Sequence, residues 1–111
     1  MQEARFEVQG SADEPYRVHF VRSEDGNLSA YCTCPAGENG QYCKHRFRIL
    51  DGVTKDIVSG NEREVAVVAG WLPGSDVERA MEVVAQAEKE AASAKRSLSQ
   101  AKKLLATAMR D

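Results

Sequence analysis

Residues 32–45 of this chain read CTCPAGENGQYCKH, and this stretch decides the fold. It holds all three cysteines of the protein, with Cys32 and Cys34 as one pair and Cys43 followed two residues later by His45. Three thiolates and one imidazole in two close pairs form a ligand set suited to tetrahedral zinc. A disulfide between Cys32 and Cys34 would close a strained ring, and an odd number of cysteines leaves one thiol unpaired. The stretch therefore predicts one structural Zn²⁺ held by four protein ligands.

The composition is that of a small domain in which a metal would help to hold the fold. Of the 111 residues, 6% are aromatic and 29% are charged, so the chain has few large side chains for a core. The net charge of −2 gives no overall basic field that would attract nucleic acid. No apolar run reaches the roughly 18 residues of a membrane helix, and the first residues have no signal-peptide pattern. We expect a cytoplasmic, reducing location, where thiolates persist as metal ligands.

Three short extended segments precede the first cysteine pair. Residues 4–9 and 16–21 alternate apolar and polar side chains, and residues 28–32 form a third such run. Turn-forming residues 10–15 and 24–27 separate them. We expect a three-stranded antiparallel β meander that delivers the first zinc ligands at its end.

The chain changes character after the first cysteine pair. Residues 35–41 contain proline, glycine and asparagine, so we expect a loop. Residues 43–51 carry apolar side chains at helical spacing, and Gly52 stands where a helix would end. The predicted fold class is α+β, in which residues 1–52 form a zinc-organised head made of three strands and one short helix.

The head resembles the SWIM zinc finger family. The resemblance is carried by the pattern Cys32-x-Cys34, eight residues, Cys43-x-His45, by the tetrapeptide CTCP and the tripeptide CKH that contain the ligands, and by the apolar helix that follows. It covers about residues 3–52 and implies that these four residues bind zinc. It also implies a role in DNA binding or protein–protein contacts, as in transposases and helicase-associated proteins. The long C-terminal segment lies outside the resemblance.

Residues 53–75 form a connector with one expected short helix. Residues 61–64 have the form of a capping box, and apolar side chains follow at helical spacing through Leu72. The run from Val65 to Val68 is rich in β-branched residues and also fits a buried strand. We favour a helix at about residues 62–71.

Residues 76–111 form one long helix in our prediction. A capping box at residues 75–78 precedes them, and no glycine or proline follows. Apolar residues recur at alternating spacings of three and four, as in a coiled coil, and the helix would be about 50 Å long. This stripe, which we call the seam, consists of Val77, Ala80, Val84, Ala87, Ala91, Ala94, Leu98, Ala101, Leu105 and Ala108.

The charges of this helix are segregated along its length. Residues 76–92 carry five acidic and two basic side chains, for a net charge of −3. Residues 93–110 carry five basic side chains and no acidic one, for a net charge of +5. Two such helices laid antiparallel would match acid to base. We therefore expect the seam to pair in an antiparallel manner, either with a second copy of the chain or with a helix of another protein.

A local basic surface is a second candidate site. Its members are Arg17, Arg22, Lys44, Arg46 and Arg48. Phosphate binding is one interpretation, but eight acidic and six basic residues share positions 1–52, which favours an ordinary solvated surface. No residue set suggests catalysis. We expect a non-enzymatic protein-interaction module, with a nucleic-acid-binding adaptor as the alternative.

Overall fold

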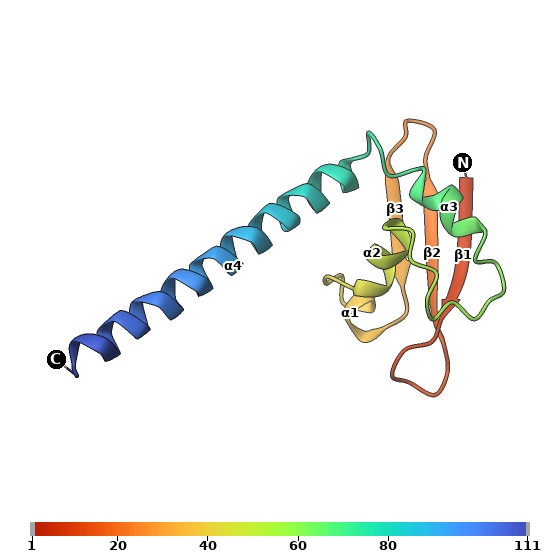
Figure 1. Cartoon of the computed structure of the whole chain (residues 1–111). Helices are drawn as coiled ribbons and strands as arrows, with labels where there is room; N and C mark the ends of the chain where they lie inside the picture. The colour runs from red at the N-terminus through yellow and green to blue at the C-terminus, as the bar shows by residue number, and fades with distance from the viewer. Residues whose placement is uncertain (1, 111) are drawn as a thin grey trace. The chain divides into compact units, whose positions relative to one another are not determined.

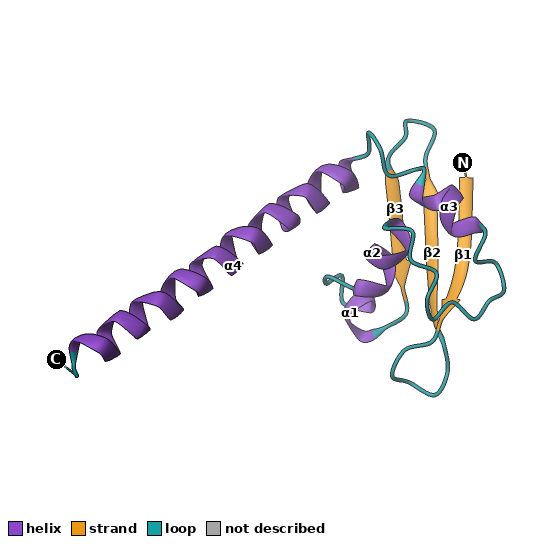
Figure 2. Cartoon of the chain, viewed as in Figure 1, coloured by secondary structure: helices purple, strands orange, loops and turns teal. Residues whose placement is uncertain are grey.

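The computed structural model describes residues 2–110 and confirms the α+β class. The element order is β1 (Gln2–Val8), β2 (Tyr16–Arg22), β3 (Leu28–Cys32), α1 (Pro35–Glu38), α2 (Lys44–Leu50), α3 (Glu64–Ala69) and α4 (Asp76–Ala108). The three strands form an antiparallel sheet in the order β1-β2-β3, as the alternation predicted (Figures 1 and 2). The chain divides into two compact units, the first ending at Glu78 and the second starting at Arg79.

One face of the sheet carries the core of the first unit. Phe6 and Phe20 lie almost fully buried, with ring centroids 6.0 Å apart in an edge-to-face arrangement. The opposite face of β2 presents Arg17 and His19, which are more exposed. Ile49 of α2 and Val68 of α3 are also almost fully buried and belong to the same apolar core. The alternation in the strands therefore places the short helices on one side of the sheet.

The segment after α2 packs against the sheet and belongs to the first compact unit. Ile57 forms an isolated antiparallel bridge with Val8, and the amide of Val58 donates to the carbonyl of Glu7 at 2.9 Å. The side chain of Asn61 donates to the carbonyl of Arg5 at 2.7 Å. These bonds cover the outer edge of β1, which would otherwise be free to pair with another chain. The part that the sequence treats as a connector is thus built into the head.

Two local predictions differ from the structure. The expected loop at residues 35–41 begins with the short helix α1, because Pro35 starts it and the sulfur of Cys34 accepts a hydrogen bond from the amide of Gly37. The helix expected at residues 62–71 is confirmed over the strand alternative, but it is limited to Glu64–Ala69. Its predicted capping box is absent, because the Asn61 side chain bonds to β1 instead.

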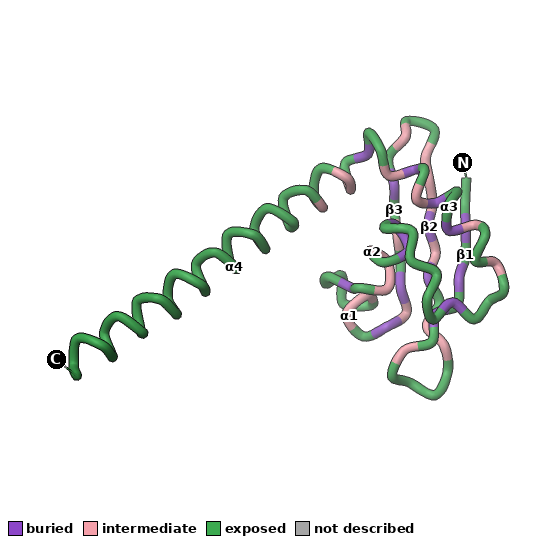
Figure 3. Tube along the Cα trace, viewed as in Figure 1, coloured by how far each residue is buried: buried purple, intermediate pink, exposed green. Residues whose placement is uncertain are grey.

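Helix α4 begins with the predicted Ser75 cap, but the reciprocal bond of the capping box goes to the amide of Gly74 instead of that of Ser75. The amide of Glu78 donates to the hydroxyl of Ser75 at 3.1 Å, and the carboxylate of Glu78 accepts from the amide of Gly74 at 3.1 Å. The helix then continues for 33 residues, none of which is buried within residues 2–110 (Figure 3). None of the helices that the structure describes is long and apolar enough to cross a membrane.

Candidate metal centre

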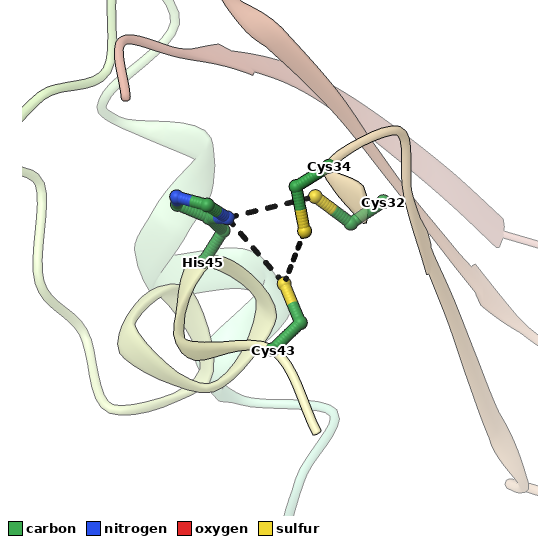
Figure 4. A group of neighbouring side chains, drawn as sticks. All are labelled: Cys32, Cys34, Cys43 and His45. Carbon is green, nitrogen blue, oxygen red and sulfur yellow. Dashed lines mark hydrogen bonds between the residues drawn. The ribbon is translucent and has the colours of Figure 1, made fainter. Parts of the chain in front are cut away.

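The four predicted ligands come together at the junction of β3, α1 and α2 (Figure 4). Cys32 ends β3, Cys34 is the N-cap of α1, Cys43 is the N-cap of α2, and His45 lies in the first turn of α2. The register between β2 and β3 fixes the first ligand, because Cys32 pairs with Val18 on the buried face of the sheet. The N-terminal ends of α1 and α2 then place the other three ligands around Cys32.

The distances among the ligand atoms fit one tetrahedral zinc ion. The sulfurs of Cys34 and Cys43 lie 3.4 Å apart, and Nδ1 of His45 lies 3.4 Å from the sulfur of Cys43 and 3.8 Å from that of Cys32. All four ligand atoms lie within 4.8 Å of one another. A tetrahedron with Zn–S bonds of about 2.3 Å and a Zn–N bond of about 2.0 Å separates its ligand atoms by about 3.5–3.8 Å. The four side chains therefore fit one structural Zn²⁺, with Nδ1 as the histidine ligand atom.

The surroundings of the site hold the ligands in place. The ring of Tyr16 lies against His45 with centroids 5.1 Å apart. The guanidinium of Arg46 donates to the carbonyls of Ala30 on β3 and Gln41 in the preceding loop, at 3.1 and 2.6 Å. These contacts tie α2 to the end of the sheet, so the ligands from the two elements stay in reach of one metal. Outer contacts of this kind orient metal ligands in zinc proteins.

The pKa values of the Cys32 and Cys43 thiols are shifted in opposite directions. Burial raises the pKa of Cys32 to about 12, against a lowering by the amide of Cys34. Burial also acts to raise the pKa of Cys43, but the amide of Arg46 and the neighbouring thiols outweigh it, so the pKa of Cys43 is lowered. A thiolate at the start of a helix is favoured in this way.

The pKa of His45 is lowered, which favours metal binding by its imidazole. Burial lowers the pKa of His45, and the positive charges of Lys44 and Arg48 lower it further, against a raising by Asp56. A lowered pKa keeps the ring neutral at neutral pH, and only the neutral ring can bind a metal.

Zinc affinity is expected to rise as the pH is raised from about 6 to 8, because zinc must displace thiol protons. The raised pKa of Cys32 means that this thiol keeps its proton throughout that range in the metal-free head. The lowered pKa of His45 reduces the competition between protons and zinc for the imidazole, so we expect the thiols to account for most of the pH dependence. Calorimetric titration in buffers of different ionisation enthalpy should count about two to three protons released per zinc near neutral pH. A count near zero would contradict thiolate ligation.

The five basic residues predicted as a surface are not brought together. Arg46 is used in the contacts to β3, and the guanidinium of Arg22 donates to the side chain of Gln2 at 3.0 Å. Arg17 lies exposed on β2, on the sheet face opposite the core. Only Lys44 and Arg48 lie together, both exposed on α2.

These two residues line an open cleft of about 870 Å³ beside the ligands. Lys55 and Tyr42 line the same cleft, as do three of the four ligands. The sequence alone does not indicate Lys55, because it reaches the cleft only through the return of residues 56–58 to β1. Tyr42 is 62% exposed and stacks on Phe47 with centroids 4.7 Å apart.

A Cys₃His cluster closed by four protein ligands, at the end of a small antiparallel sheet, defines the head as a structural zinc finger. Residues 6–49 match the family model of the SWIM zinc finger, so this part of the chain is a SWIM zinc finger, as its spacing predicted. Searches of curated proteins and of solved structures each found no match.

Proposed function

We propose that this chain is a non-catalytic interaction module, in which the zinc finger forms a folded head and α4 joins it to another protein chain. The observation that carries this proposal is the exposure of the seam. Leu98 and Leu105 of the seam are 56% and 59% exposed, and Val84 is 39% exposed. An unbroken apolar stripe on a long helix favours a partner that removes it from water.

The properties of the zinc site support a structural role for the head. Four protein ligands leave no open coordination position for a water or a substrate, so the ion would cross-link the chain rather than activate a nucleophile. The thiols are then metal ligands and are not free to act as nucleophiles. The chemistry of the head is thus that of a scaffold.

The proposal is tested by changing the seam in the full, zinc-loaded chain. Ala87 lies in the seam and Ala85 lies on the opposite side of the same helix, so Ala87→Glu and Ala85→Glu introduce the same charge at equal helix propensity. Cross-linking followed by mass spectrometry in the native cell should show protein contacts of α4 that Ala87→Glu removes and Ala85→Glu retains. If no contact to any protein, including the chain itself, depends on the seam, the proposal is wrong.

A nucleic-acid-binding adaptor is the second candidate, and the cleft beside the zinc site favours it. Lys44, Arg48 and Lys55 place three positive charges around this cleft against the single carboxylate of Asp56. The exposed ring of Tyr42 offers a surface on which a base could stack. Phosphate contacts and stacking together are the usual means of binding single strands.

If the cleft binds nucleic acid, reversing its charges should weaken binding to a fluorescent oligonucleotide at low salt. Arg48→Glu combined with Lys55→Glu should reduce affinity at least about tenfold and reduce the salt dependence, because fewer counterions are released. Arg5→Glu combined with Arg63→Glu changes the net charge equally at exposed positions outside the cleft. Equal losses in both double variants, or no binding by the unchanged chain at low salt, would exclude the cleft as the binding site.

A further inference from the structure

We infer that the partner of the seam is a second copy of the same helix, laid antiparallel, with the two-fold axis between Ala92 and Ser93. This inference rests on the proposed function and specifies the partner of α4. Its basis is the fit of the helix to itself in size and in charge. No residue of α4 is buried in the described part of the chain.

The seam is made of one row of large residues and one row of small residues. The first row, which we call the large row although its middle member is an alanine, is Val77, Val84, Ala91, Leu98 and Leu105, and the small row is Ala80, Ala87, Ala94, Ala101 and Ala108. In an antiparallel coiled coil, each layer of the interface joins a residue of one row to a residue of the other row. The pairing therefore sets the large row of each copy on the small row of the other.

In this arrangement each valine or leucine of the seam meets an alanine, and only the two layers beside the two-fold axis, where Ala91 meets Ala94, join two alanines. Leu98 meets Ala87 of the second copy, Leu105 meets its Ala80, and the same contacts repeat beyond the two-fold axis. In a parallel pair, each row would meet itself, so Leu98 would face Leu98 while Ala94 faced Ala94. Alternating wide and narrow layers cannot all be filled at one spacing between the helix axes, and interiors disfavour such voids. The size pattern therefore favours the antiparallel pair.

The residues that flank the seam agree with the same register. Glu88 of each copy lies opposite Lys95 of the other, which gives two symmetric ion pairs. Val83 and Leu104, which are 69% and 73% exposed, also lie opposite each other and extend the apolar contact at both ends. In a parallel pair, Glu88 would face Val83, and Glu90 would instead meet Lys95. The distribution of charge along the whole helix also favours the antiparallel pair, because the acidic half of each helix would lie along the basic half of the other.

The length of the helix is sufficient for such a pair. The seam runs through Val77 to Ala108, which is more than the three to four heptads that a coiled coil requires. Alanine buries little area, so we expect a dimer that dissociates on dilution rather than an obligate one.

Sedimentation equilibrium of the zinc-loaded full chain should show a concentration-dependent rise from 12.2 kDa towards twice that mass. Ala87→Glu should weaken dimerisation more than tenfold, whereas the matched Ala85→Glu should leave it unchanged, because only Ala87 lies in the seam. A monomer at every concentration would overturn the inference, while the proposed function would still be decided by its own cross-linking test.

The orientation is tested by two substitutions that change the charge equally. In the antiparallel register, Glu88→Lys should weaken the dimer about tenfold at low salt, because it turns two exposed ion pairs into repulsions. Adding Lys95→Glu to it should restore the affinity, since the pairs re-form with reversed charges. Glu90→Lys should have little effect, because Glu90 lies opposite Ser97. A dimer sensitive to Glu90→Lys and insensitive to Glu88→Lys would be parallel and would overturn the inferred register.

Discussion

Removing zinc is expected to unfold the head, with Trp71 as the reporter. Trp71 is the only tryptophan of the chain and is 7% exposed, so its emission should shift to longer wavelength when a chelator removes the metal. The reason is that the zinc-binding energy is about as large as the whole folding stability of a small domain. Zinc contributes on the order of 10 kcal/mol to folding in small zinc modules, and a whole domain is stable by only about 5–15 kcal/mol. Part of the helical circular dichroism should remain, because α4 holds no metal ligand.

Substitution of a ligand should have the same effect as the chelator. Cys34→Ser and His45→Asn each remove one of the four ligands and should prevent a native tryptophan spectrum even in excess zinc. His19→Asn is the matched control, because His19 is the other histidine of the chain and lies on β2, with its Nε2 3.8 Å from a carboxylate oxygen of Glu3. At 3.8 Å this contact is longer than a hydrogen bond, and His19 is not a metal ligand, so His19→Asn should retain one zinc per chain.

The structural role of zinc would be disproved by two results. One is a metal-free chain whose tryptophan spectrum and thermal unfolding match those of the loaded chain. The other is a His45→Asn variant that binds zinc as tightly as His19→Asn does. Elemental analysis together with the unfolding curve distinguishes a lost metal from a lost fold.

Strong local chemistry explains which parts of this fold could be predicted from the sequence. The strands alternate cleanly because one face of the sheet is buried, and the ligands are paired because zinc needs them near each other. The Ser75 cap of α4 also formed as predicted, since the residues that it joins are neighbours in the chain. Such features depend on a few adjacent residues and little on the rest of the fold.

The features that the sequence did not reveal depend on contacts between distant segments. The capping box expected at Asn61 fails because its side chain reaches Arg5, which lies 56 residues earlier. Tyr16 and Lys55 reach the metal site and its cleft only because the β1–β2 hairpin and the return of residues 56–58 bring them there. The short helix α1 likewise depends on a cysteine sulfur that acts as a cap, and cysteine is not a usual capping residue. The helix and strand propensities of single residues do not contain information about these contacts.

Gly37→Ala is expected to destabilise the head and weaken zinc binding, although alanine normally favours a helix over glycine by about 1 kcal/mol. A Cβ on Gly37 would lie 2.8 Å from the Cβ of Cys32 and even closer to the carbonyl oxygen of Cys32. Neither atom can move freely, because one belongs to the backbone of β3 and the other to a zinc ligand. Helix α1 would therefore shift away from β3, and Cys34, whose sulfur accepts from the Gly37 amide at 3.3 Å, would shift with it. We expect a loss of about 1–3 kcal/mol in unfolding free energy and a 10- to 100-fold loss of zinc affinity.

Gly40→Ala separates this steric effect from a purely conformational one. Gly40 has a φ of +69°, and a Cβ there would meet nothing within 4 Å, so its substitution costs backbone strain of about 1 kcal/mol and no contact. Its zinc affinity, measured by competition with a chelating dye, should equal that of the unchanged chain. Equal zinc affinities in the two alanine variants would show that the close approach of α1 to Cys32 does not position Cys34. A loss of zinc affinity in Gly37→Ala alone would show that the metal site requires glycine at position 37, where α1 and β3 are too close for a Cβ atom.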